Sequence, residues 1–187
     1  MNLFKLLTVA ALSLTAVACA SDAPSDKAGR QAEVRQATQT SLGKFYKAKP
    51  ELQQEVASSP GYAVFTTYGI SFIVGGAGGK GLVHDNTTGT DTFMDAAQAS
   101  AGLQAGAAQT DTLIIFKNHD ALRQFVEKGW VAGGQAVAQA GAKGESVGPG
   151  TGENVIADAR YYTLTPNGLQ AGVAAAGTKY WKDKDLN

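Results

Sequence analysis

The chain has 187 residues with 16 lysines and arginines and 16 aspartates and glutamates, so its formal net charge is zero. This balance argues against a nucleic-acid-binding protein, because such proteins usually carry a basic excess. A single cysteine excludes an internal disulfide, so in an exported protein that thiol needs another explanation. The 23 glycines lie between large apolar residues, which favours closely packed strands over a flexible linker.

The first 18 residues have the pattern of a signal peptide. Lys5 is their only charge, the stretch from Leu6 to Leu14 is mostly apolar, and small residues lead to Cys19. The apolar stretch is much shorter than the roughly 20 residues that span a bilayer as a helix. Two cleavage types remain open: ordinary secretion, and the lipoprotein type, since Ala16-Val17-Ala18-Cys19 resembles a lipobox without the usual leucine at its first position.

The position of the cysteine favours the lipoprotein type. Cleavage before Cys19 makes it the first mature residue, where acylation (palmitate or similar chains) anchors the protein, because two or more chains bind a membrane stably. Ala20 follows instead of the aspartate that often marks inner-membrane retention, so we expect the outer membrane, facing the periplasm. The expected organisation is a signal peptide at 1–18, a flexible tether at 19–28 and one domain at 29–187.

The domain begins with two predicted helices. Residues 29–47 place apolar and small side chains at i, i+3 and i+4 spacing, which indicates a helix. Pro50 favours the first turn of a second helix at 51–58, and Pro60-Gly61 ends it.

After residue 61 the hydrophobic period changes from about 3.6 to 2, which indicates strands. A third helix begins after Asn118 and ends at Gly129, and a glycine-rich loop covers 141–152. The predicted fold class is α+β: a glycine-rich, twisted, barrel-like antiparallel sheet covered by the amino-terminal helices and the one internal helix. The strands are predicted at 62–67, 71–77, 79–84, 92–99, 103–109, 112–116, 131–140, 155–163 and 169–180.

One glycine motif has a misleading form. The run from Gly76 to Gly81 matches G-x-G-x-x-G by letter. Dinucleotide binding needs a helix after these glycines, so that its amide groups can hold the pyrophosphate. Because Leu82-Val83-His84 continues as a strand, we expect a close pair of strands and no bound cofactor.

The residue pattern does not favour an enzyme. His84 and His119 are each followed by an aspartate, but successive residues point apart on a strand and do not face each other on a helix. The sequence has no second cysteine, no H-E-x-x-H and no G-x-S-x-G. We therefore expect no catalysis and no metal, since metal binding by the histidines would need carboxylates gathered in space.

Basic residues on the first predicted helix are the best candidates for a site. Arg30, Arg35, Lys44, Lys47 and Lys49 lie close to the lipid tether. A helix with cations and an apolar stripe can lie on anionic headgroups. The alternative is a helix that covers the sheet with its apolar face while its lysines are solvated, and the sequence leaves both open.

Four segments between about Lys44 and Tyr180 carry a resemblance to a known family: Gly61–Phe65, Phe72–Gly81, Gly102–Ala107 leading into Leu113–Phe116, and Gly168–Val173. In the order and spacing of these segments the chain resembles the SYLF family, a lipid-binding domain whose eukaryotic members also bind actin. The resemblance implies phospholipid binding through the amino-terminal helix and nearby basic surface, without catalysis. It makes Lys44, Lys47 and Lys80 candidate lipid-binding residues, to which the helix pattern adds Arg35.

The sequence thus predicts a non-enzymatic envelope lipoprotein that binds phospholipid, preferably with anionic headgroups. The alternative function is a structural or assembly module that binds another envelope protein without recognising lipid. No nucleic-acid partner is expected, and actin binding is not expected in a bacterial envelope.

Overall fold

The computed structural model describes residues 26–72, 74–101, 106–131, 158–166, 168–171 and 178–187. The predicted signal peptide, Cys19, most of the tether and the loop at 141–152 lie outside these residues. The elements of the described part are α1 Lys27–Ala48, α2 Glu51–Ser58, β1 Gly61–Phe72, β2 Val74–Asp85, β3 Thr90–Ala101, β4 Gly106–Phe116, α3 His119–Lys128, β5 Trp130–Val131, β6 Ala159–Thr165, β7 Gly168–Ala171 and β8 Thr178–Lys182.

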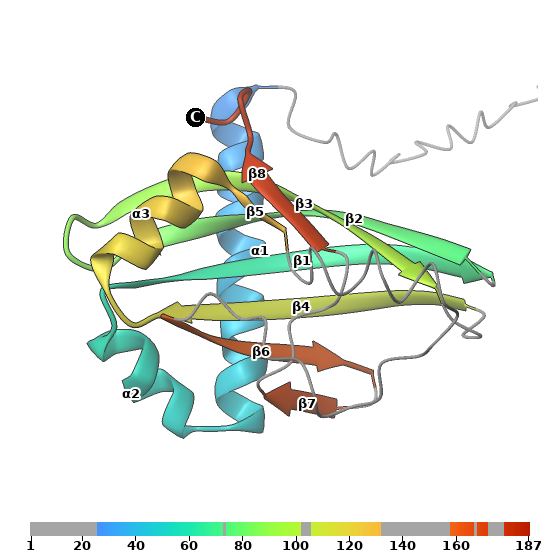
Figure 1. Cartoon of the computed structure of the whole chain (residues 1–187), viewed down its shortest axis with the longest axis horizontal. Coiled ribbons are helices and arrows are strands. Elements are labelled where there is room, and N and C mark those ends of the chain that lie inside the picture. Colours follow the sequence, from blue (N-terminus) through green and yellow to red (C-terminus); the bar gives the residue numbers. More distant parts are fainter. Residues whose placement is uncertain (1–25, 73, 102–105, 132–157, 167, 172–177) are drawn as a thin grey trace, which may run out of the picture.

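The eight described strands form one antiparallel sheet in the order β5-β8-β3-β2-β1-β4-β6-β7. Figure 1 shows a twisted sheet with α1 running across its strands and α3 near one end. The predicted α+β class, with an antiparallel sheet and covering helices, is confirmed. The strand order is open, since β5 and β7 are the two edges among the described strands.

Two long strands replace the three that were predicted between residues 62 and 84. β1 and β2 each have 12 residues and pair along their whole length. The predicted break near Gly69 is wrong, because Gly69 pairs with Ala77 in mid-strand and two such small residues let the backbones stay close. The predicted break before Thr112 is also wrong, since β4 runs through Asp111 without interruption.

The last two predicted strands, 155–163 and 169–180, are expected to pair as a hairpin around residues 165–168, and this prediction is half right. β6 and β7 pair as expected, with Leu164 opposite Leu169. Residues 178–182 form the separate strand β8, which pairs with β3 instead of β6, so the prediction of one strand at 169–180 is wrong in its second half. The predicted strand at 131–140 lies outside the described residues after Val131.

Each face of the sheet has its own hydrophobic core. On the face covered by α1 and α2, which we call the α1 face, Phe45 and Leu52 are fully buried. On the opposite face, Phe125 of α3 packs on Phe65, Phe116 and Tyr180 with ring centroids 5.3–6.2 Å apart. Such aromatic contacts add to the free energy of apolar burial. The sheet is thus fixed between α1 and α3.

Local signals explain where the helices begin and end. The Asn118 side chain accepts the backbone N–H of Ala121 at 2.8 Å, and Gly129 ends α3 with a φ of 65°, as the sequence predicts. The Asp26 side chain caps α1 in the same way by accepting the N–H of Gly29 at 3.1 Å. Among the described helices, none has the length and apolar character needed to cross a bilayer.

The G-x-G-x-x-G run lies entirely inside β2, so no helix follows its glycines. A Cβ at Gly79 or Gly81 would overlap the carbonyl oxygen of Thr66 or Val64 on the neighbouring strand β1. These glycines therefore allow close packing of two strands, and the prediction that the run belongs to a close pair of strands is confirmed.

Candidate functional site

The α1 face carries a row of side chains that crosses five strands. Strand register aligns Thr66 of β1 with Lys80 of β2 and with Asp111 of β4. Lys80 is opposite Asp95 of β3, which in turn is opposite Trp181 of β8. Alternate residues of a strand share a face of the sheet, and the side chains of this cross-strand row all lie on the α1 face.

Lys44 reaches this row from α1. Its Nζ donates to Oδ2 of Asp111 at 2.8 Å, and the Asp111 side chain is only 4% exposed. The other carboxylate oxygen accepts from Ser41 at 3.1 Å, Thr66 at 2.8 Å and Gln109 at 3.0 Å. A buried charge is tolerated only when it is paired and hydrogen-bonded, and Asp111 meets both conditions.

The hydrogen bonds change the proton affinity of Asp111. Burial alone would raise the pKa of its carboxyl group, but the hydrogen bonds from Lys44, Gln109 and Thr66 outweigh burial and lower that pKa. Asp111 therefore stays ionised at neutral pH and holds Lys44 against the sheet.

Lys80 is paired in the same row. Its Nζ donates to Asp95 at 2.8 Å and also to Asp183, which follows β8 and is buried. Burial alone would lower the pKa of Lys80, but these two carboxylates outweigh it and raise that pKa. Lys80 thus links β2 and β3 to the carboxyl-terminal segment.

Arg35 forms a third such contact, away from the row. Its Nε donates to Oδ2 of Asp91 at 2.7 Å, while Oδ1 of Asp91 lies 2.7 Å from Nδ1 of His84. The sequence did not reveal this histidine–aspartate pair, because the two residues meet across the β2–β3 hairpin. Since Arg35 occupies the other carboxylate oxygen, we interpret the pair as a link between α1 and the sheet.

The remaining candidates are placed differently. Lys47 lies in the last turn of α1, is exposed, and forms no ion pair within the described part of the chain. Cys19, the predicted lipidation site, is outside the described residues. The structure therefore places Lys80 and Asp111, the partner of Lys44, on either side of Thr66, while Arg35 and Lys47 lie elsewhere on α1.

A groove of about 400 Å³ lies between α1 and the strands β1 and β4. Its lining is mainly polar and includes one acid and one cation. Tyr68, at its edge, has an exposed fraction of 63%. The lining residues are Glu33, Gln36, Ala37, Thr40, Ser41, Lys44, Thr66, Tyr68 and Gln109.

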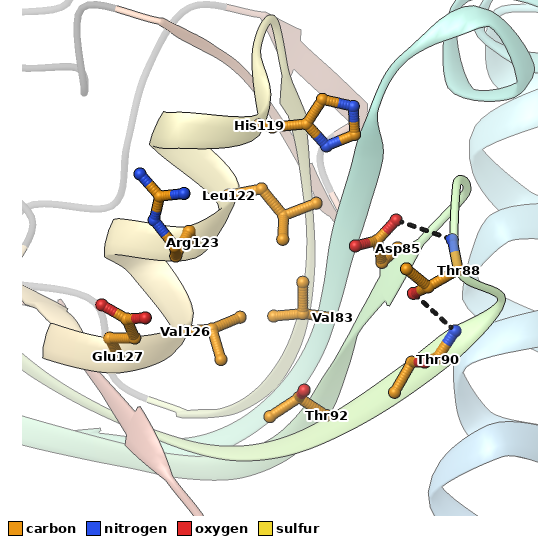
Figure 2. A pocket seen from close by; sticks show the side chains of 10 residues that line it. All are labelled: Val83, Asp85, Thr88, Thr90, Thr92, His119, Leu122, Arg123, Val126 and Glu127. Carbon is orange, nitrogen blue, oxygen red and sulfur yellow. Dashed lines mark hydrogen bonds between the residues drawn. The ribbon is translucent and has the colours of Figure 1, made fainter.

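A second groove of about 370 Å³ lies between α3 and the β2–β3 hairpin on the opposite face. Figure 2 shows Leu122 and Val126 pointing from α3 toward Val83, with His119 and Asp85 at the rim. The Asp85 carboxylate accepts the backbone N–H groups of Thr87 and Thr88, so it closes the hairpin turn. The lining of this second groove contains acidic and basic residues around apolar ones, and it includes none of the residues predicted for the site.

Two exposed aromatic residues on the α1 face were missed by the sequence reasoning. Tyr68 and Trp181 are the exposed large hydrophobic residues of the described part of the chain. Their strand alternation is readable from the sequence, but the register that places both strands in one sheet is not.

Known proteins match this chain as follows. A family model named Ysc84, described as Las17-binding protein actin regulator, matches residues 97–187. Beta cell expansion factor A of Aeromonas veronii is 27% identical over 148 residues, which cover 79% of this chain and 55% of that protein.

Yeast proteins match with similar identity. LAS seventeen-binding protein 3 of Saccharomyces cerevisiae is 27% identical over 133 residues, or 68% of this chain and 29% of that protein. Protein YSC84 of the same yeast is 26% identical over 133 residues, or 68% of this chain and 28% of that protein. The chain spans about half, or less, of the length of these relatives.

Proposed function

Because the chain belongs to the SYLF family, whose model is named Ysc84, we propose that it is a non-enzymatic module that binds phospholipid with its folded domain. SYLF membership indicates a lipid- or actin-binding module. Of these partners, phospholipid is the one that a cell envelope offers, and the signal-peptide pattern favours the envelope.

One observation carries the choice of a lipid surface. Residues 69–79 and 96–110 contain no charged residue and no histidine. Of these, the described residues 69–72, 74–79, 96–101 and 106–110 form the ends of β1 to β4, which extend past α1 in Figure 1. Charged side chains are costly near hydrocarbon, so a sheet end without charge can approach acyl chains without that cost. Gly78 and Ala97 are exposed there, which leaves a flat surface.

The contacts of His84 support a role without catalysis. His84 and Asp91 are close enough for a proton-transfer pair, but Arg35 shares the carboxylate and the three residues join α1 to two strands. This arrangement stabilises the α1 face and does not direct an activated group into either groove.

The proposed function includes a lipid anchor at Cys19. Acylation of Cys19 after removal of residues 1–18 would hold the domain at the outer membrane, facing the periplasm. Lipid binding by the domain then adds a second contact with the same leaflet or with the facing membrane. Actin, which the description of the family model names, is not part of this proposal.

Vesicle binding tests the proposal. A Cys19→Ser protein without its signal peptide should sediment with vesicles of phosphatidylethanolamine and phosphatidylglycerol at low salt, and less at high salt because ionic screening weakens headgroup contacts. Lys47→Gln should weaken binding about fivefold, since one lysine near an anionic surface contributes roughly 1 kcal/mol.

Lys128→Gln removes the same charge from α3 on the opposite face and is the matched control. If the unlipidated protein does not sediment with anionic vesicles at low salt, intrinsic lipid recognition is wrong and a protein partner in the envelope becomes the better function.

A further inference from the structure

The two exposed aromatic residues lie on the α1 face of the sheet, three strands apart. Tyr68 has an exposed fraction of 63% and Trp181 one of 37%. Tyr68 is opposite Gly78, which is opposite Ala97, which is opposite Lys179. Tyr68 and Lys179 thus share one cross-strand row. Trp181 lies two residues along β8 from Lys179, in the row that also contains Asp95 and Lys80.

These positions define a band perpendicular to the strands. Three strand spacings separate β1 from β8, or about 14 Å, and the two rows are about 7 Å apart along the strands. Between the aromatics only small residues, Gly78 and Ala97, occupy the outer row, and both are exposed. We call Tyr68, Lys80, Lys179 and Trp181 the aromatic band.

Its composition is typical of a membrane–water interface. Tyrosine and tryptophan have an apolar ring and a polar group, and both are enriched at headgroup level. The Nζ of Lys179 lies 5.8 Å from the Trp181 ring centroid, so its stem follows the ring while its charge stays at the surface. Because Asp95 and Asp183 neutralise Lys80, this lysine contributes little, and the aromatic rings should supply most of the affinity of the band.

The strand segments beyond the band agree with a bilayer whose normal is parallel to the strands. From Gly69 to Phe72, β1 extends four residues past Tyr68, which is about 13 Å and close to half of a hydrocarbon core of roughly 30 Å. Neither these residues nor the paired ends of β2, β3 and β4 carry a charge. A bilayer normal parallel to the strands would place the band at the headgroups and the uncharged sheet end below it.

The start of α1 lies on the band's side of the fold. Gln31 donates to the carbonyl oxygen of Leu186 at 2.6 Å, four residues after the end of β8. Figure 1 shows the start of α1, the end of β8 and the carboxyl terminus close together. Seven residues lie between Cys19 and Lys27, so an extended tether of eight residue steps reaches at most about 28 Å. The predicted lipid anchor and the band can therefore reach one bilayer.

We propose that Tyr68, Lys80, Lys179 and Trp181 form an interfacial band that sits among the headgroups of a phospholipid bilayer, with the strands directed toward its interior and α1 parallel to its surface. This inference rests on the proposed lipid binding and goes beyond it by fixing the face and the orientation.

Fluorescence of Trp181 tests the orientation directly. In a Cys19→Ser protein without signal peptide and with Trp130→Phe, Trp181 is the only tryptophan. With vesicles of phosphatidylethanolamine and phosphatidylglycerol, its emission should move to shorter wavelength. Lipids brominated near the headgroup should quench it more strongly than lipids brominated near the chain end.

Variants supply a second readout. Tyr68→Ser should weaken vesicle binding about tenfold, because an aromatic side chain loses apolar contact, and Trp181→Phe should retain most of it. Lys179→Gln should weaken binding more than Lys128→Gln, which makes the same change of charge on α3. Circular dichroism and urea midpoints establish that each variant is folded.

The outcomes separate the two proposals. Sedimentation together with quenching and loss of affinity in Tyr68→Ser supports the band. Sedimentation with unquenched Trp181 and unchanged affinity of Tyr68→Ser overturns the band and leaves lipid binding through another surface. Absence of sedimentation overturns both.

Discussion

Asp111 determines the stability of the α1 face at the scale of single residues. It is almost fully buried and accepts hydrogen bonds from four side chains on α1, β1 and β4. Asp111→Asn keeps the side-chain volume but removes the charge that holds Lys44. The amide N–H groups of the asparagine would also face groups that now donate hydrogen bonds to the carboxylate. We expect the free energy of unfolding to fall by about 2–3 kcal/mol, measured by urea denaturation.

The pH dependence gives the same prediction a second readout. The pKa of Asp111 is lowered in the folded protein, so its contribution to stability is complete above the unfolded pKa of about 3.9 and is lost as the pH falls through the folded pKa. The difference between wild type and Asp111→Asn should therefore shrink below about pH 4. Asp95→Asn is the control: its carboxylate is 25% exposed and Lys80 keeps Asp183, so the cost should stay below about 1 kcal/mol. Equal costs would contradict the role of Asp111.

Sequence reasoning found the cations of this face but not their partners. Arg35, Lys44 and Lys80 are visible as positive residues near a predicted helix or strand. Asp91 and Asp111 lie 56 and 67 residues further along than Arg35 and Lys44, so only the strand register brings them into contact. Long-range pairs of this kind depend on which strands become neighbours, and no local pattern encodes that choice. The exposed aromatics Tyr68 and Trp181 were missed for the same reason.

At the scale of elements, the packing of β1 on β2 depends on glycine. A Cβ at Gly79 would overlap the backbone of Thr66, whereas nothing lies within 4 Å of a Cβ at Gly78. Gly79→Ala should lower the free energy of unfolding by at least about 2 kcal/mol, because the two strands would have to separate. Gly78→Ala should change it by less than about 0.5 kcal/mol, since Ala fits and restricts the unfolded chain. Thermal unfolding of the two variants measures the contrast, and similar melting temperatures would rule out this packing.

Local sequence signals explain which elements were predicted correctly and which strands were divided. Helices α1, α2 and α3 were predicted to within a few residues, because caps and period signal them locally. The long strands were divided at Gly69 and before Thr112, since glycine and polar residues usually mark turns. In β1 and β4 tertiary packing overrides that local preference: small residues oppose Gly69, and Asp111 is bonded inward. β8 joined β3 although its sequence neighbour β7 pairs with β6, and such a crossover leaves no local signal.

At the scale of the whole molecule, we propose that the lipid anchor at Cys19 and the folded domain act on the same membrane. Domain surfaces with two aromatic residues and few unpaired cations bind lipid weakly alone, but a covalent tether makes that contact intramolecular and raises its effective concentration. Stable attachment should therefore depend on Cys19, while the α1 face and the aromatic band set how the attached domain lies.

Fractionation of cells that express the full chain tests the anchor. Cys19→Ser should move the protein from the membrane fraction to the soluble periplasm, because the roughly 0.8 kcal/mol contributed by each buried methylene of the acyl chains is lost. Ala20→Asp, which keeps the acylated cysteine, should stay with membranes but shift from the outer to the inner one. Mass spectrometry of the mature amino terminus should find acyl chains on wild type and on Ala20→Asp, and none on Cys19→Ser. Recovery of Cys19→Ser in the membrane fraction at wild-type level would show that the domain attaches by itself and that the anchor is dispensable.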